Sequence, residues 1–125
     1  MANKQVAVFM GDDASPEVMA PTVDLLRGMD LGIDFIKPVV GQLAKETSGT
    51  LFPDEAKEQI DAADATFFGS TSGNSTPVLF YLRWGKQTFA NLRPCVYVPG
   101  FNSPMASPDG IDFAIIRENL EDLYL

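Results

Sequence analysis

Three arginines and one tyrosine in the second half of the chain are the residues best suited to chemistry: Arg83, Arg93, Arg117 and Tyr124. A guanidinium group stays charged when it is partly buried, and it can bind a carboxylate through two parallel hydrogen bonds. If the three arginines converge, they would suit a ligand that carries several carboxylates. Spacing alone supports an alternative equally well, namely three separate salt bridges at the surface.

Two loops offer weaker candidates for ligand binding. The segment from Gly69 to Gly73 could cradle a phosphate on its backbone amides. It lacks the Lys-Ser/Thr pair and the G-x-G-x-x-G pattern of nucleotide-binding loops, so a flexible connection is the favoured interpretation. Asp12 and Asp13 could bind a divalent metal, but adjacent carboxylates after a strand more often form a turn that faces a helix N-terminus. We therefore predict no metal site and assign no residue to a cofactor.

Nucleophilic catalysis is not supported by the residue types present. The chain has no histidine, which excludes the usual catalytic triads. Its single cysteine, Cys95, follows Pro94 in a predicted strand and is interpreted as a small core residue. One cysteine also excludes an intramolecular disulfide.

Charge and hydropathy exclude two classes of partner. A formal net charge of −8, with no basic run, would repel a phosphate backbone, so we predict no nucleic-acid binding. No apolar run approaches the roughly 20 residues that span a bilayer, so we predict no membrane segment. The N-terminal residues do not have the pattern of a signal peptide, and we expect a cytoplasmic protein.

Apolar runs and turn residues predict the elements that must position these side chains. Strands are expected where short runs rich in β-forming residues end at turns, and helices where Pro and acidic residues precede an amphipathic stretch. The predicted strands are residues 5–10, 33–40, 65–68, 89–98 and 111–116. The predicted helices are residues 15–28, with Ser15 as N-cap, and 53–60, followed by a helix-like stretch at 78–86. Residues 47–52 are expected to form a loop.

Strands and helices alternate through the first half of the chain, which is typical of an α/β fold. Close alternation favours a parallel sheet with right-handed crossovers and helices on both faces. With 125 residues the chain is long enough for one compact domain and too short for two. We therefore predict a single α/β domain over residues 1–125.

Four segments resemble the isocitrate/3-isopropylmalate (β-decarboxylating) dehydrogenase family. They are QVAVFMGDDASPEVM, TLFPDEAKEQIDAADATFFGS, YLRWGKQTFANLRP and IIRENLEDLY. The intervals agree as well, since Arg93 follows Arg83 by 10 residues, Arg117 follows Arg93 by 24, and Tyr124 follows Arg117 by 7. The resemblance spans nearly the whole chain and implies the N-terminal segment of that family, with an incomplete version of its fold.

The resemblance implies roles for the candidate residues. Arg83, Arg93 and Arg117 would grip the carboxylates of a 2-hydroxy acid, and Tyr124 would help to protonate the intermediate formed after decarboxylation. The segment between residues 72 and 82 would set specificity, with Pro77, Leu79 and Phe80 facing the variable substituent of the substrate. The apolar character of these three residues points away from the extra carboxylate of isocitrate.

Two departures from the family pattern bear on activity. The opening loop, usually G-D-G-I-G-P-E-V, has Asp13 and Ser15 in place of two glycines at a position that lies against the nicotinamide cofactor in the family. Family members are also longer, two-domain proteins, and the remaining part holds the metal-binding aspartates, the catalytic lysine and most of the cofactor site. Hydride transfer and this type of decarboxylation require both cofactors.

The resemblance and the departures together lead to two functional hypotheses. In the first, the chain is not catalytic alone; it retains a polycarboxylate-binding arginine set and self-associates or serves as an accessory, without cofactors. In the second, it is a subunit or fragment of an oxidative decarboxylase whose partner supplies the rest, with NAD(P) and Mg²⁺ or Mn²⁺. A folded remnant without a ligand is the third alternative.

Overall fold

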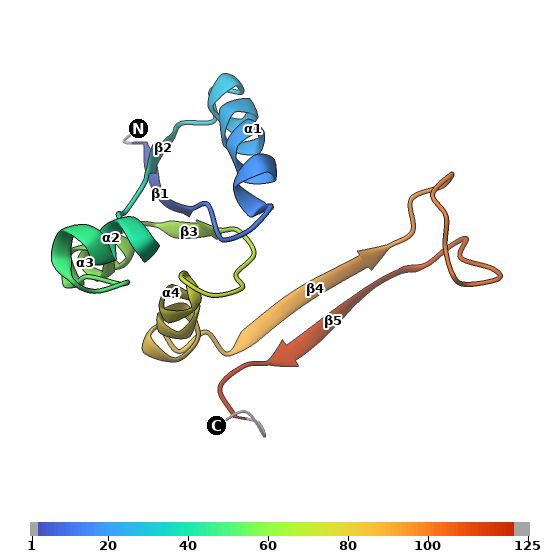
Figure 1. The fold of residues 1–125 in the computed structure, drawn as a ribbon. Coiled ribbons are helices and arrows are strands. Elements are labelled where there is room, and N and C mark those ends of the chain that lie inside the picture. The colour runs from blue at the N-terminus through green and yellow to red at the C-terminus, as the bar shows by residue number, and fades with distance from the viewer. Residues whose placement is uncertain (1–2, 122–125) are drawn as a thin grey trace. The chain divides into compact units, whose positions relative to one another are not determined.

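The computed structural model describes residues 3–121, and these fall into two compact units, Met1–Phe80 and Tyr81–Leu125. The first unit alternates strands and helices (Figure 1). Its elements are β1 (Lys4–Phe9), α1 (Ser15–Gly28), β2 (Ile33–Ile36), α2 (Gly41–Ser48), α3 (Asp54–Ala62), β3 (Ala65–Phe68) and α4 (Thr76–Phe80). That the two units form one domain stays a prediction.

A three-stranded parallel sheet organises the first unit, with the order β2-β1-β3. Because β2 and β3 lie on opposite sides of β1, right-handed crossovers place α1 on one face and the α2–α3 pair on the other, as Figure 1 shows. Val8 packs with Met19 and Val23 of α1. Alternation along β1 turns Phe9 to the other face, where its ring lies 5.9 Å from that of Phe68. The predicted α/β class is confirmed.

Helix α1 has the predicted bounds, but its N-terminus differs from the prediction. Ala14 occupies the N-cap position, and no side chain caps the helix. Ser15 is instead the first helical residue, and its hydroxyl oxygen accepts a hydrogen bond from the Ser70 N–H at 3.0 Å. The N-cap prediction was wrong because this hydroxyl bonds a residue far away in sequence.

Helix α2 was not predicted, and the second strand is shorter than predicted. The strand ends at Ile36, before Pro38, which lacks the N–H that a ladder needs. Gly41 and Gly49 bound the helix at φ +69° and +80°, and the Gly49 N–H donates to the Lys45 carbonyl at 3.0 Å. Ala44 anchors the helix, being fully buried. Helix α3 begins at Asp54, one residue after the predicted start, and continues two residues beyond Ile60.

The second unit is built differently from the first. A π-helical turn, η1 (Tyr81–Gly85), precedes β4 (Ala90–Val96) and β5 (Asp112–Glu118). These two strands pair with each other as an antiparallel hairpin and do not extend the parallel sheet. The parallel arrangement, predicted from the alternation in the first half of the chain, holds for the three strands there, whereas β4 and β5 are antiparallel. The physical reason is the connection at residues 97–111, which contains no helix to carry the chain back along a parallel path.

Within residues 3–121, every helix is too short or too polar to cross a lipid bilayer.

Candidate functional site

The Asp12 carboxylate holds the loop that follows β3. Its Oδ2 atom accepts hydrogen bonds from the backbone N–H groups of Ser72, Gly73 and Ser75 at 3.1, 3.1 and 3.2 Å. The hydroxyl groups of Thr71 and Ser75 donate to the same oxygen at 3.0 and 2.6 Å. Five donors therefore converge on one oxygen atom, which makes the 71–75 loop an ordered structure. The sequence-based interpretation of this segment as a flexible connection was wrong.

Close backbone contact joins the same two loops on the other side of Asp12. The Asp12 N–H donates to the Ser70 carbonyl at 2.8 Å. A Cβ atom on Gly11 would lie 2.2 Å from that carbonyl oxygen, and one on Gly69 would lie 2.5 Å from the Met10 carbonyl oxygen. Ser15, which is buried, lies between the loops. These two glycines are therefore required because the backbones approach too closely for any side chain.

The two departures from the family loop have structural explanations here. Asp13 adopts φ +53°, a left-handed conformation that glycine adopts easily and aspartate tolerates better than most residues. Ser15 supplies the hydroxyl that accepts the Ser70 amide. Both substitutions fit the observed path of the chain.

The environment of Asp12 changes its pKa. Burial raises the pKa of this carboxyl, but the hydrogen bonds from Ser75, Ser72 and Thr71 outweigh it and lower the pKa from 3.8 to about 2. Because the folded-state value lies below the unfolded one, the stabilisation is present above pH 4 and is lost as the pH falls towards 2.

We predict a corresponding pH dependence of stability. Between pH 5 and pH 2, the wild type should lose about 1–2 kcal/mol more unfolding free energy than Asp12→Asn, after allowing for solvent screening of this half-buried group. Urea unfolding at several pH values checks this. The depressed pKa values of Asp54 and Asp64 act in both proteins and cancel in the comparison. Ser75→Ala, which removes one donor, should give an intermediate loss; parallel curves for wild type and Asp12→Asn would contradict the assignment.

Arg93 and Arg117 lie on one face of the β4–β5 hairpin. In the antiparallel register Arg93 is opposite Ile115, and Asn91 is opposite Arg117. Opposed residues share a face and alternate residues along a strand share a face, so the two arginines are diagonal neighbours. Side chains at such positions are typically ~7–8 Å apart, within reach of a common small ligand. Arg93 is exposed and Arg117 is half-buried.

The other predicted site residues lie elsewhere. Arg83 is half-buried in η1, where its carbonyl accepts a hydrogen bond from the Thr88 N–H at 2.9 Å. Leu79 is half-buried in α4 of the first unit, whereas the three arginines belong to the second unit. Tyr124 lies outside the described residues. Cys95, predicted to be a core residue, is exposed, because its strand pairs only within a two-stranded hairpin in the described residues.

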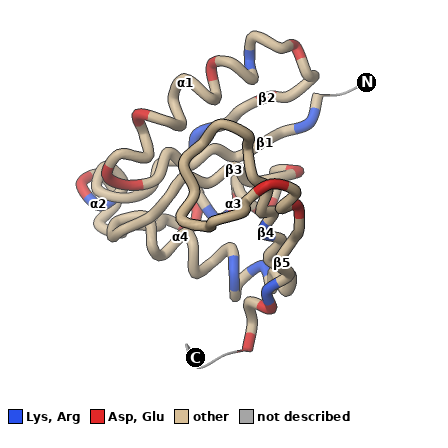
Figure 2. Tube along the Cα trace, turned by 90° about the vertical axis from the view of Figure 1, so that its right-hand side faces the viewer, with Lys and Arg blue, Asp and Glu red and all other residues tan. Residues whose placement is uncertain are grey.

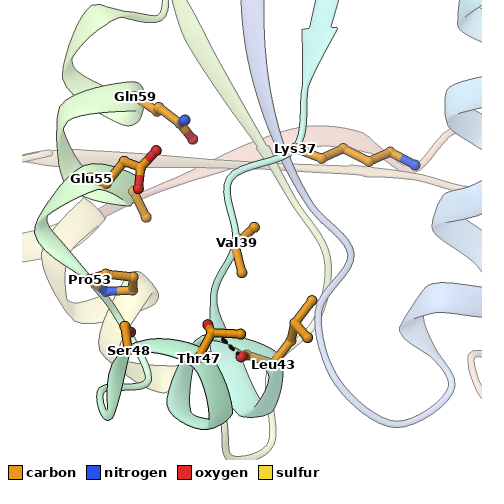
Figure 3. A pocket seen from close by; sticks show the side chains of 9 residues that line it. Lys37, Val39, Leu43, Thr47, Ser48, Pro53, Glu55 and Gln59 are labelled. Carbon is orange, nitrogen blue, oxygen red and sulfur yellow. Dashed lines mark hydrogen bonds between the residues drawn. The ribbon is translucent and has the colours of Figure 1, made fainter.

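A separate cavity of about 340 Å³ lies among α2, α3 and the segment after β2 (Figure 3). Val39, Leu43 and Pro53 give it an apolar lining. Glu55 and Gln59 of α3 extend towards it, whereas the Lys37 side chain points away from them (Figure 3). Because the Glu55 carboxylate would repel an anion, this cavity does not suit a polycarboxylate.

Two observations on residues 3–121 bear on the cofactors of an oxidative decarboxylase. No group of three acidic, cysteine or histidine residues within 3–121 is placed to hold a metal ion. The amides of Ser72, Gly73 and Ser75 already bind the Asp12 carboxylate, so they cannot also bind a dinucleotide phosphate. Lys and Arg positions are scattered along the trace and form no long basic stretch in the described residues (Figure 2).

Comparison with known proteins identifies the family. The family model of isocitrate/isopropylmalate dehydrogenase matches residues 5–125. This chain belongs to that family. A 3-isopropylmalate dehydrogenase from Methanothermobacter thermautotrophicus is 38% identical over 125 residues, which are 100% of this chain and 37% of the relative. A 3-isopropylmalate/3-methylmalate dehydrogenase from Methanocaldococcus jannaschii is 32% identical over 120 residues, 96% of this chain and 35% of the relative.

Solved structures agree with this assignment. The isocitrate dehydrogenase of Methylococcus capsulatus matches with a TM-score of 0.74 at 25% identity, covering 97% of this chain and 36% of its own. A β-decarboxylating dehydrogenase from Thermococcus kodakarensis matches with a TM-score of 0.69 at 26% identity, covering 94% of this chain and 34% of its own. The chain thus spans about a third of the length of these isocitrate/isopropylmalate dehydrogenase relatives and has an incomplete version of their fold, as predicted.

Proposed function

We propose that this member of the isocitrate/isopropylmalate dehydrogenase family binds the carboxylates of a small 2-hydroxy polyacid and is not catalytic alone. The observation that carries the proposal is the placement of Arg93 and Arg117 on one face of the β4–β5 hairpin. Two fixed positive charges at diagonal positions can each pair with one carboxylate of the same ligand. Arg83, ten residues before Arg93, would supply a third.

Several relatives are named as dehydrogenases of 3-isopropylmalate, which favours a 2-hydroxy acid with an apolar substituent. Leu79, Pro77 and Phe80 of α4 are apolar, and the first two are half-buried. In this proposal they would contact that substituent in a completed enzyme, where Tyr124 would have the proton-donating role that the family resemblance implies.

The open faces of the hairpin support association with another chain. On the face opposite the arginines, Leu92, Val96 and Ile116 are 66%, 59% and 69% exposed. A two-stranded hairpin is marginally stable in water unless something packs against it. A second copy would make the chain a self-associating accessory. A partner that supplies the catalytic part of the family fold would instead make it part of an NAD(P)- and Mg²⁺- or Mn²⁺-dependent decarboxylase.

Titration calorimetry on the full chain tests the binding function. The ligands are 3-isopropylmalate, isocitrate, tartrate and citrate, with succinate as a dicarboxylate that lacks the hydroxyl group. We expect saturable binding with 3-isopropylmalate tightest, and silence across all five would overturn the proposal. Sedimentation velocity on the same samples decides association, since a monomer at every concentration would exclude the self-associating form.

A further inference from the structure

We propose that Asp12 is a positioning residue, whose carboxylate occupies an anion-binding nest at residues 71–75 and thereby fixes the start of α4. Because Leu79 lies in α4, Asp12 would also position this specificity residue; that consequence rests on the proposed function. The nest itself does not, because it is defined by contacts within the first unit.

The 71–75 loop has the features of an anion nest. Three backbone N–H groups and two hydroxyl groups point at a single carboxylate oxygen at distances between 2.6 and 3.2 Å. Successive amides that converge in this way form a concavity suited to negative charge. In this protein the anion belongs to the chain itself, since Asp12 lies in the loop after β1.

Polar contacts, and not apolar packing, fix the conformation of this loop. Ser72, Gly73 and Asn74 are exposed, and among residues 71–75 only Ser75 is buried. Because no apolar side chain anchors residues 72–74, the carboxylate holds them to the loop after β1, next to the hydrogen bond between the Asp12 N–H and the Ser70 carbonyl. The charge of the carboxylate makes each of the five hydrogen bonds stronger than a neutral one.

Ser75 transmits this attachment to α4. Both its N–H and its hydroxyl group donate to Asp12, at 3.2 and 2.6 Å. Its carbonyl accepts the N–H groups of Val78 and Leu79, at 3.1 and 3.3 Å. Ser75 and Val78 are 4% and 0% exposed. The residue that Asp12 holds is therefore also the residue on which the first turn of α4 is built, one turn before Leu79.

Amide hydrogen exchange on the full chain tests the nest. In Asp12→Ala, exchange at Ser72, Gly73 and Ser75 should accelerate by about 10-fold or more, because each hydrogen bond to a charged acceptor is lost. Amides of β1 should keep their rates. Asp12→Asn retains an acceptor oxygen without the charge and should accelerate less. Asp13→Asn is the matched control, because it removes the neighbouring charge with a residue that tolerates positive φ, and it should leave these rates unchanged.

Adding a small carboxylate to the Asp12→Ala variant distinguishes a specific anion nest from a general loosening of the loop. Sodium formate added to Asp12→Ala should bind the vacated nest and restore protection at the three amides in a saturable way, whereas sodium chloride at equal ionic strength should not. Unchanged exchange in Asp12→Ala, or equal effects of formate and chloride, would overturn the nest.

Calorimetry separates this inference from the proposed function. If the wild type binds 3-isopropylmalate, Asp12→Ala should reduce the preference for it over isocitrate by about 10-fold, as expected when an apolar contact is misplaced. If amide exchange in Asp12→Ala accelerates while the preference for 3-isopropylmalate over isocitrate stays constant, the inference that Asp12 positions Leu79 is overturned. If the wild type binds no polyacid, the proposed function fails while the exchange and formate measurements still decide the nest.

Discussion

Replacing Arg93 or Arg117 with glutamine should weaken the binding of the best polycarboxylate by about 10-fold to 100-fold. A hydrogen-bonded charge pair contributes about 1.5–3 kcal/mol, which corresponds to that range of dissociation constants. Glutamine keeps a hydrogen-bond donor of similar reach but has no charge and no guanidinium fork. Calorimetry on each variant, with melting temperatures to confirm folding, measures the effect.

The double variant and a control sharpen this prediction. If both arginines grip one ligand, as their shared hairpin face suggests, the loss in the double variant should differ from the sum of the two single losses. Arg27→Gln removes the same charge from exposed α1, where Arg27 pairs with Asp24, and should change affinity by less than about 2-fold. Equal effects of Arg27→Gln and Arg93→Gln would show that only net charge matters and would contradict the site.

Replacing Gly11 with alanine should destabilise the first unit by about 2–5 kcal/mol. Gly11 has φ +78°, and left-handed backbone costs a residue with a side chain about 1–2 kcal/mol. Its new Cβ would also lie 2.2 Å from the Ser70 carbonyl oxygen, so the two loops must separate at a further cost of about 1–3 kcal/mol. Urea unfolding followed by far-UV circular dichroism reports on this unit, which contains α1, α2 and α3.

Gly49 and Gly28 separate the cost of the left-handed backbone at Gly11 from the cost of its steric clash. Gly49 has φ +80° and open space where a Cβ atom would lie, so Gly49→Ala should cost only the backbone contribution of about 1–2 kcal/mol. Gly28, at the end of α1, also has open space and no positive φ, and its replacement by alanine should stabilise the protein by about 0.5–1 kcal/mol. If Gly11→Ala costs no more than Gly49→Ala, the close approach of the two loops is not energetically important.

Local patterns were sufficient for most elements of the first unit. The apolar run ending at Gly11 predicts β1, the Pro-acid start predicts α3, and the short apolar run from Ala65 predicts β3. Helix α2 could not be predicted in this way, because what defines it is the positive φ of Gly41 and Gly49 and the burial of Ala44. Those properties depend on where the surrounding chain lies.

For the candidate site, the sequence determined which residue types are present, and four of its segments carry the resemblance to the family to which the chain belongs. It did not determine that Arg93 and Arg117 share a face, because 24 residues of separation fix neither strand direction nor register. The antiparallel pairing of β4 with β5 decides that.

The role of Asp12 likewise appears only in three dimensions. In sequence, Asp12 and the 71–75 loop are about sixty residues apart, and each has an ordinary local interpretation as a turn or a flexible connection. The parallel pairing of β1 with β3 brings the carboxyl ends of both strands to one edge of the sheet, so an acid after one strand meets the amides after the other. Residue chemistry was determined by the sequence alone; which donors meet which acceptor was decided by the tertiary structure, because hydrogen bonds require proximity that only strand pairing provides.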